Sequence, residues 1–198
     1  MKNMINTLIL STIGLSASAQ AITISFEQGG NANFETSNSV SFLDGTGHSD
    51  GVGYKQVADA TGSDYVAFNT NQAQSSTFTW NNLDTFNLNG FTVAGAWGSQ
   101  TLTINGYNGV NLVNTIDFGI TTQAIDFIAN WVDLTSFSIL TGNDYIKSSM
   151  HSGNGQHWAI NDVIVNEAVQ SVPEPLSIAL LGLGLVGLGF SVTKKRAK

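Results

Sequence analysis

Cysteine is absent from the 198 residues of this chain. Its absence excludes disulfide bonds, thiol nucleophiles and thiolate metal sites, even though export to an oxidising compartment would permit disulfides. The fold must therefore be held together by core burial alone. Proline is almost as rare, because Pro173 and Pro175 are the only two. The long segment before them is rich in Gly, Asn, Thr and Ser and carries many Phe, Ile and Val, a composition typical of an all-β protein with many turns.

Basic residues are nearly absent from residues 22–171. Lys55 and Lys147 are the only bases in this segment, whereas it holds nearly all of the 14 acidic residues of the chain, with Glu174 as the exception. A nucleic-acid ligand needs a basic surface that displaces its counterions, so a nucleic-acid partner is excluded. The acidity names no ligand by itself, and it favours solubility.

Residues 1–21 read as a cleaved signal peptide. A basic residue near the start is followed by a short apolar run and then by two Ala-x-Ala triplets, which end at Ala19 and Ala21. This order is the layout of a secretory signal peptide, and we expect cleavage after Ala19 or Ala21. The alternative is an uncleaved anchor, for which the apolar run is short.

The other end of the chain has the features of a membrane span. Residues 176–192 carry no charge, and at about 1.5 Å per residue a helix of that length just crosses a hydrocarbon core. The tail at 193–198 is basic through Lys194, Lys195, Arg196 and Lys198. By the positive-inside rule this tail stays in the cytoplasm, which places residues 22–170 outside it. The alternative is a buried core helix, which would strand the basic cluster.

The sequence Val172-Pro173-Glu174-Pro175 stands directly before the apolar span. Together with that span and the basic end, it resembles the PEP-CTERM sorting signal of exopolysaccharide-producing Gram-negative bacteria, over residues 172–198. The resemblance implies processing by an exosortase, a membrane-embedded cysteine transpeptidase-like enzyme. It also implies a transient inner-membrane anchor facing the periplasm, followed by release to the outer envelope or the cell exterior. Because proline disfavours helix and sheet, residues 172–175 suit an extended binding mode. The alternative is a stiff linker.

Residues 22–170 contain short runs in which apolar and polar residues alternate, as in half-buried antiparallel strands. We expect nine strands, at residues 22–26, 65–68, 77–80, 91–97, 101–104, 110–118, 124–128, 135–140 and 158–165. No helix is expected, since no segment keeps an apolar helical face for three turns. These strands predict an antiparallel β-sandwich, with a jelly roll as the leading topology. Turn dipeptides are expected at Asp44-Gly45, Asn89-Gly90, Asn105-Gly106 and Asn108-Gly109.

The same segment resembles a cargo domain that often precedes PEP-CTERM tails. The resemblance is carried by Gly53-Tyr54, VAFN from Val66, FNLNGFTVAGAW ending at Trp97, LTINGYNG from Leu102 and WAINDVIV from Trp158. It implies a β-sandwich like the carbohydrate-binding and galactose-binding jelly rolls, with a sugar as the expected ligand.

No group of residues matches a catalytic motif. His48, His151 and His157 lack the spacing of zinc ligands and are expected in loops. The acidic residues are scattered singly, and neither a GxSxG elbow nor a phosphate-binding glycine loop is present. We therefore expect no catalysis. A pair of carboxylates that the fold brings together, as in a glycosidase, stays open at this point.

One metal site is a candidate. Glu27 ends the first expected strand and Asp162 lies in the last, and in jelly rolls these strands often run near one another. Oxygen ligands on neighbouring strands suit Ca²⁺, so we predict a structural Ca²⁺ site there as the one candidate cofactor. The alternative is that these are surface acids.

Tyr107 and Tyr145 lie near expected turns and are the candidate residues for stacking against sugar rings, while Trp80 and Trp97 are expected in the core. The sequence thus predicts a non-catalytic protein of the envelope or extracellular matrix that associates with exopolysaccharide or a biofilm. The alternative is a secreted polysaccharide hydrolase. Two carboxylates facing each other in an open groove would favour the hydrolase, and an aromatic platform or no cleft would favour the binding protein.

Overall fold

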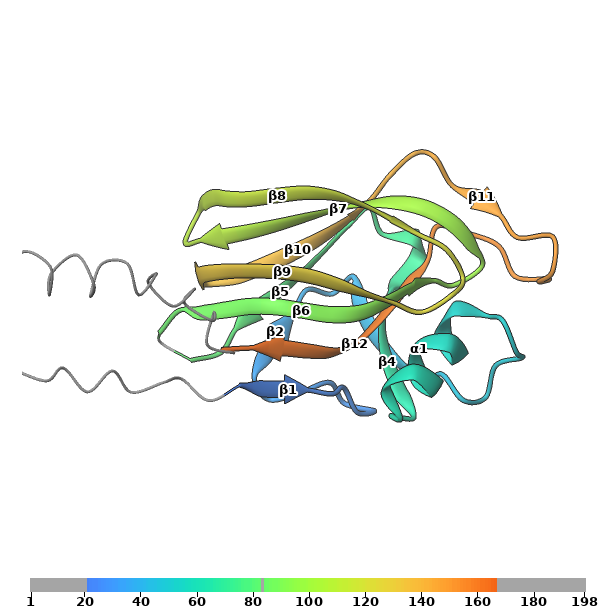
Figure 1. Ribbon diagram of the computed structural model, residues 1–198, viewed down its shortest axis with the longest axis horizontal. Helices are drawn as coiled ribbons and strands as arrows, with labels where there is room; N and C mark the ends of the chain where they lie inside the picture. The colour runs from blue at the N-terminus through green and yellow to red at the C-terminus, as the bar shows by residue number, and fades with distance from the viewer. Residues whose placement is uncertain (1–20, 83, 167–198) are drawn as a thin grey trace, which may run out of the picture. The chain divides into compact units, whose positions relative to one another are not determined.

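The computed structural model describes residues 21–82 and 84–166, which form two packed antiparallel sheets (Figure 1). The expected all-β antiparallel sandwich is therefore confirmed. The first sheet has the order β3 (Val40–Asp44), β4 (Tyr65–Asn69), β12 (Trp158–Val165), β6 (Phe86–Gly95) and β9 (Ile125–Leu134), with β1 (Ile22–Ile24) also on β12. The second has the order β11 (Ile146–Lys147), β7 (Gly98–Asn108), β10 (Ser136–Thr141), β5 (Ser75–Trp80) and β2 (Phe34–Thr36), with β8 (Asn111–Ile120) also on β7.

Each of the nine expected strands overlaps a strand of the structure, and β2, β3 and β11 are additional. β2 and β11 have only three and two residues, and in β3 the alternation of Val40, Ser41 and Phe42 is broken by Leu43. The expected span at 176–192 lies outside the described residues. Within the described residues, no helix is long and apolar enough to cross a membrane.

Two of the expected turn dipeptides are wrong. Gly90 lies inside β6 and Gly106 inside β7. A Cβ on Gly90 would come 2.2 Å from the carbonyl oxygen of Phe127, and one on Gly106 would come 2.9 Å from the ring of Trp131. Both glycines therefore serve close approach within the sandwich and not chain reversal. The dipeptide Asn108-Gly109 does connect β7 to β8, and Gly109 has a positive φ of 58°.

The expectation that the domain has no helix is also wrong, because α1 spans Gly53–Thr61. A single 3-10 turn, η1 (Thr70–Gln72), follows β4. Nine residues make only two and a half turns, so the apolar face of α1 falls short of the three turns that the sequence criterion requires. The helix forms because it buries Tyr54, Val57 and Ala58 against the outer face of the first sheet.

Aromatic side chains fill the space between the sheets. Phe78 of β5 stacks on Phe137 of β10 with ring centroids 4.7 Å apart, and Phe34 meets both rings edge-on. Trp80 is buried in the same cluster, as expected, whereas Trp97 is half-buried beside Tyr54 under α1. A chain without cysteine thus gains its stability from burial of large apolar surfaces, each worth about 25 cal/mol per Å² removed from water.

Candidate functional site

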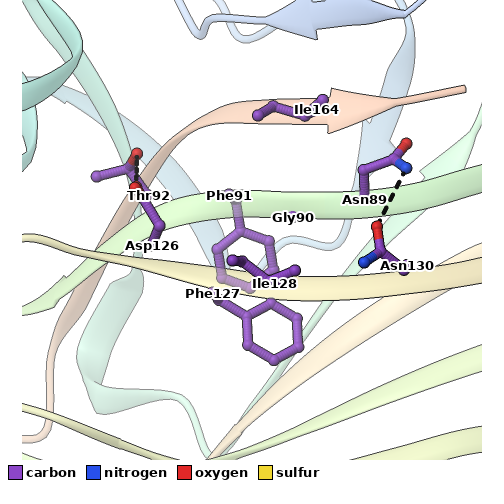
Figure 2. A pocket seen from close by; sticks show the side chains of 9 residues that line it. All are labelled: Asn89, Gly90, Phe91, Thr92, Asp126, Phe127, Ile128, Asn130 and Ile164. Atoms are coloured by element: carbon purple, nitrogen blue, oxygen red, sulfur yellow. Dashed lines mark hydrogen bonds between the residues drawn. The ribbon is translucent and has the colours of Figure 1, made fainter. Parts of the chain in front are cut away.

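A hollow of about 350 Å³ opens on the outer face of the first sheet, above β6 and β9 (Figure 2). The same face is covered by α1 further along β6, where Ala94 packs under the helix. The hollow therefore occupies a part of the sheet that the helix leaves open. We call it the β6–β9 hollow, and it is lined by Asn89, Gly90, Phe91, Thr92, Asp126, Phe127, Ile128, Asn130 and Ile164.

Paired polar side chains stand at the two ends of the hollow, as Figure 2 shows. At one end the Thr92 hydroxyl donates to Asp126 Oδ1 at 2.9 Å, and the two residues are register partners on β6 and β9. At the other end Asn89 Nδ2 donates to Asn130 Oδ1 at 3.4 Å. Asn130 has a positive φ of 51°, beside an irregularity in the strand register. The bulged backbone thus aims its amide at Asn89.

The floor of the hollow is set by the close approach of two strands. Gly90 lies against the Phe127 carbonyl, where no side chain would fit. Phe91 and Phe127 turn inward, with ring centroids 4.8 Å apart and side chains almost fully buried. The aromatic rings therefore support the floor from the core side and present no stacking platform to a ligand.

Ile128 stands between the two polar ends and is 71% exposed. The hollow thus combines a carboxylate, a hydroxyl and two amides with one exposed apolar side chain. Such a set can donate and accept hydrogen bonds and can contact the C–H faces of a polyhydroxylated ligand. Asp126 is the only carboxylate among the nine lining residues, and acid–base hydrolysis of a glycoside needs two.

Two further hollows are lined mostly by loop residues. One, of about 570 Å³, runs from Trp80 to Thr85 and reaches Asn166, and another, of about 390 Å³, lies between the start of β7 and the loop after β11. Strands hold side chains more rigidly than loops do, and a rigid support favours specific binding. We therefore take the β6–β9 hollow as the candidate site.

The structure does not bring the two candidate sugar-contact tyrosines together. Tyr107 is near the end of β7 that leads into β8, and its hydroxyl accepts from Asn105 Nδ2 at 3.3 Å. Tyr145 lies beside the opposite end of β7, where β11 pairs with Gly98. Both side chains are half-buried, and burial raises the pKa of Tyr145. Neither residue lines the β6–β9 hollow, and their role in sugar contact stays a prediction.

The expected neighbourhood of the first and last strands is confirmed, because β1 pairs with β12 and Ile24 lies opposite Val163. Asp162 Oδ1 accepts from the Ser25 hydroxyl at 2.6 Å. Glu27 is exposed and bridges to Gly30 through backbone hydrogen bonds. Within the described residues, no three His, Cys, Asp or Glu side chains are grouped as metal ligands. Ca²⁺ at Glu27 and Asp162 stays a prediction.

The three histidines lie around the loops that precede α1 and β12. His48 is 4.9 Å from the Tyr54 ring, and its burial lowers the pKa of its imidazole. His151 lies over Gly51, and His157 Nδ1 is 2.8 Å from the carbonyl oxygen of Asn69. These contacts account for the histidines as packing and hydrogen-bonding residues of the loops.

The β6–β9 hollow was not predicted from the sequence, and none of the expected site residues lines it. The hollow unites residues from β6, β9 and β12, which are far apart in the chain. Asn89-Gly90 was expected to form a turn. The strand expected at 91–97 was therefore not extended back to Phe86, where β6 begins. The signal that could have extended the strand is the apolar alternation of Phe86 and Leu88, which resumes with a shifted phase at Phe91 and Val93.

The expected sorting residues are Val172, Pro173, Glu174 and Pro175. They lie outside the described residues, as do the basic residues after the expected span, Ala19 and the expected signal peptide before it. Their assignment rests on sequence. Residues 171–196 match the PEP-CTERM protein-sorting motif. The match implies an exported protein that an exosortase processes. No curated protein matches the chain in sequence.

Solved structures with a similar arrangement include carbohydrate-binding modules. A variant of a family 29 module aligns with a TM-score of 0.44 and 8% identity, covering 80% of this chain and 99% of that one. Another family 29 module aligns with a TM-score of 0.39 and 12% identity, covering 80% and 97%. A family 61 module solved with β-1,4-galactotriose gives 0.31 and 14%, covering 68% and 88%.

Proposed function

We propose that this chain is an exported, exosortase-processed protein of the cell envelope or extracellular matrix, and that its β-sandwich is a non-catalytic module that binds exopolysaccharide. The sorting motif at 171–196 supports the route of export and processing. The β6–β9 hollow supports the molecular role, since it carries neutral amides, a hydroxyl and one exposed isoleucine. Matrix polysaccharide is also the polymer that a protein released by this route would meet.

The charge of the domain narrows the proposed ligand to neutral glycans. Lys55 is one of its two bases, and it is already paired with Asp59 at 2.9 Å on α1. Asp126 adds a negative group to the hollow itself. A polysaccharide rich in uronic acids would therefore meet repulsion from like charges both at the site and over the domain. A neutral polymer meets none.

Hydrolysis is the less supported function for the same hollow. A retaining or inverting glycosidase needs two carboxylates about 5 to 9 Å apart on either side of the scissile bond. The lining offers Asp126 alone, and this group is engaged by Thr92. The arrangement therefore supports binding without cleavage.

Substitution of the hollow provides the test of this role. On an array of neutral and acidic glycans, the parent protein should bind neutral polymers and release no reducing sugar from them. Asp126→Ala and Ile128→Ala should each weaken this binding about tenfold, equivalent to about 1.4 kcal/mol. Both side chains are exposed, so the melting temperature should change little.

Ile146→Ala is the matched control, because Ile146 is 68% exposed but lies on β11, in the other sheet. Its glycan binding should equal that of the parent. Binding that survives both hollow substitutions would contradict the assignment of the site. Cleavage of a bound glycan would contradict the non-catalytic role.

A further inference from the structure

The outer face of the second sheet is polar over β7 and β10. Alternation along β10 places Phe137 in the core and turns Ser136 and Ser138 outward. Ser136 lies in register with Tyr107 of β7, and Ser138 lies in register with Asn105. Because register partners share a face, Tyr107 and Asn105 also point outward. The helix α1 packs on the first sheet, against β4, β6 and β12, and leaves this polar face uncovered.

The Tyr107 side chain lies along this face and does not stand out from it. Its hydroxyl accepts from Asn105 Nδ2 at 3.3 Å, two residues back on the same strand. An upright ring would carry its hydroxyl away from that amide, since residues two apart on a strand are separated by about 6.6 Å. Asn105 and Ser138 are only 8% and 3% exposed although they point outward, as expected for residues beneath the ring. The half-buried ring therefore rests one face on the sheet and turns the other to solvent.

Two hydrogen-bonded pairs of threonine and aspartate continue this face along β7. The Thr103 hydroxyl donates to Asp117 Oδ1 of β8 at 2.6 Å, and the two residues are register partners. The Thr101 hydroxyl donates to Asp144 Oδ2 at 2.6 Å. At about 3.3 Å per residue, Thr101 and Tyr107 are about 20 Å apart, which is long enough for several linked sugar rings. We call the set of Tyr107, Thr103, Asp117, Thr101 and Asp144 the β7 strip.

The β7 strip repeats the chemistry of the β6–β9 hollow on the other outer face of the sandwich. In the hollow, Thr92 donates to its register partner Asp126. The strip has the equivalent cross-strand pair in Thr103 and Asp117. In both places the carboxylates can accept from sugar hydroxyls, and neither set contains a basic residue. The strip adds an aromatic face on which the C–H side of a sugar ring can stack, so both surfaces favour a neutral glycan.

We infer that the β7 strip is a second glycan-binding surface, so that one domain bridges two polysaccharide chains, one on each outer face. The inference rests on the proposed function, since it assigns the same class of ligand to a second face. The two outer faces point away from each other across the core, so one straight segment of polymer cannot occupy both. Bridging links neighbouring chains of a matrix, which a single site cannot do. The strip lies on an open sheet face, whereas the hollow surrounds its ligand on several sides. The hollow should therefore bind more tightly and dominate binding on an array.

A capture assay with the exported and processed protein tests this bridging. Beads carry dextran, a β-glucan or a galactan, and a fluorescent soluble form of the same polymer is added together with the protein. The parent should bind the beads and hold the soluble polymer on them. Tyr107→Ala should bind the beads like the parent through the hollow, which also shows that it folds, but should capture about tenfold less polymer. Tyr107→Phe keeps the ring and should capture within about twofold of the parent.

Tyr65→Ala is the matched control, because Tyr65 is also half-buried but begins β4 in the first sheet and belongs to neither surface. Its bead binding and its capture of polymer should equal those of the parent. If the parent binds the beads but captures no polymer, or if Tyr107→Ala captures as much as the parent, bridging through the strip is wrong and the proposed function stands. If the parent binds none of the three polymers on beads, the proposed function is contradicted and bridging with it.

Discussion

Replacing Pro173, Glu174 and Pro175 with alanine is expected to abolish processing of the tail while leaving export and folding intact. The three residues lie within the matched sorting motif at 171–196 and directly precede the apolar stretch at 176–192. The alanine variant keeps that stretch and the basic end, so the signals for membrane insertion and orientation remain. It loses the two prolines that disfavour helix and sheet, and the carboxylate between them. The protein should therefore accumulate at full size in the inner membrane.

The measurement compares the size and membrane fraction of both forms in cells that have a working exosortase. Alanine substitution of Val169 and Gln170, just before the motif, is the matched control and should be processed like the parent. In cells without exosortase the parent and the variant should look the same. If the variant is trimmed and released at the parent's rate, the motif acts only as a linker and the sorting assignment is wrong.

Asn161→Leu is expected to lower the free energy of unfolding by about 3 kcal/mol. The side chain is fully buried on β12 and makes three hydrogen bonds. Its Oδ1 accepts from the backbone N–H of Phe26 at 2.9 Å, and its Nδ2 donates to Thr61 Oγ1 at 3.1 Å and to the Tyr65 carbonyl at 3.0 Å. One amide thus ties the chain after β1, the end of α1 and the start of β4 to a central strand. Leucine has a similar size but cannot hydrogen-bond, so it leaves the buried backbone N–H of Phe26 without the Asn161 acceptor.

Denaturant unfolding of the purified protein measures this loss, which should appear as a lower midpoint at an unchanged m-value. Asn143→Ala is the control, because Asn143 is exposed before β11 and its loss should change stability by less than about 0.5 kcal/mol. Equal stability of Asn161→Leu and the parent would mean that the three hydrogen bonds are replaced without cost.

Asn161→Asp separates the charge of the group from its shape. Burial and the neighbouring Tyr65 carbonyl disfavour a negative charge, so the pKa of the introduced carboxyl should lie above its usual value in the folded state. The folded form then binds the proton more tightly than the unfolded form. Stability should be greatest at low pH and should fall as the pH rises above about 4, the ordinary carboxyl pKa. A parent measured over the same range supplies the reference for this slope.

The sequence by itself determined the sorting motif near the C-terminus and the all-β class of the middle of the chain. A sorting signal is read as a linear order of parts, so residues 172–198 could be identified without a fold, and the match at 171–196 agrees. The alternation from Thr101 to Ile104 and from Trp158 to Val165 identified strands because the period of two is a local property of the chain. The lack of cysteine excluded thiol chemistry directly from composition, and the excess of acids predicts that nucleic acid is not a partner.

Only the tertiary structure decided which structural roles the glycines and polar residues have within the all-β fold. Gly90 and Gly106 looked like turn residues, and their place inside strands depends on Phe127 and Trp131, which pack against them from other strands. The helix α1 forms because a sheet face is available to bury it. The β6–β9 hollow likewise joins strands separated by long stretches of chain. Strand order is set by packing between distant segments, which no local pattern of residues encodes.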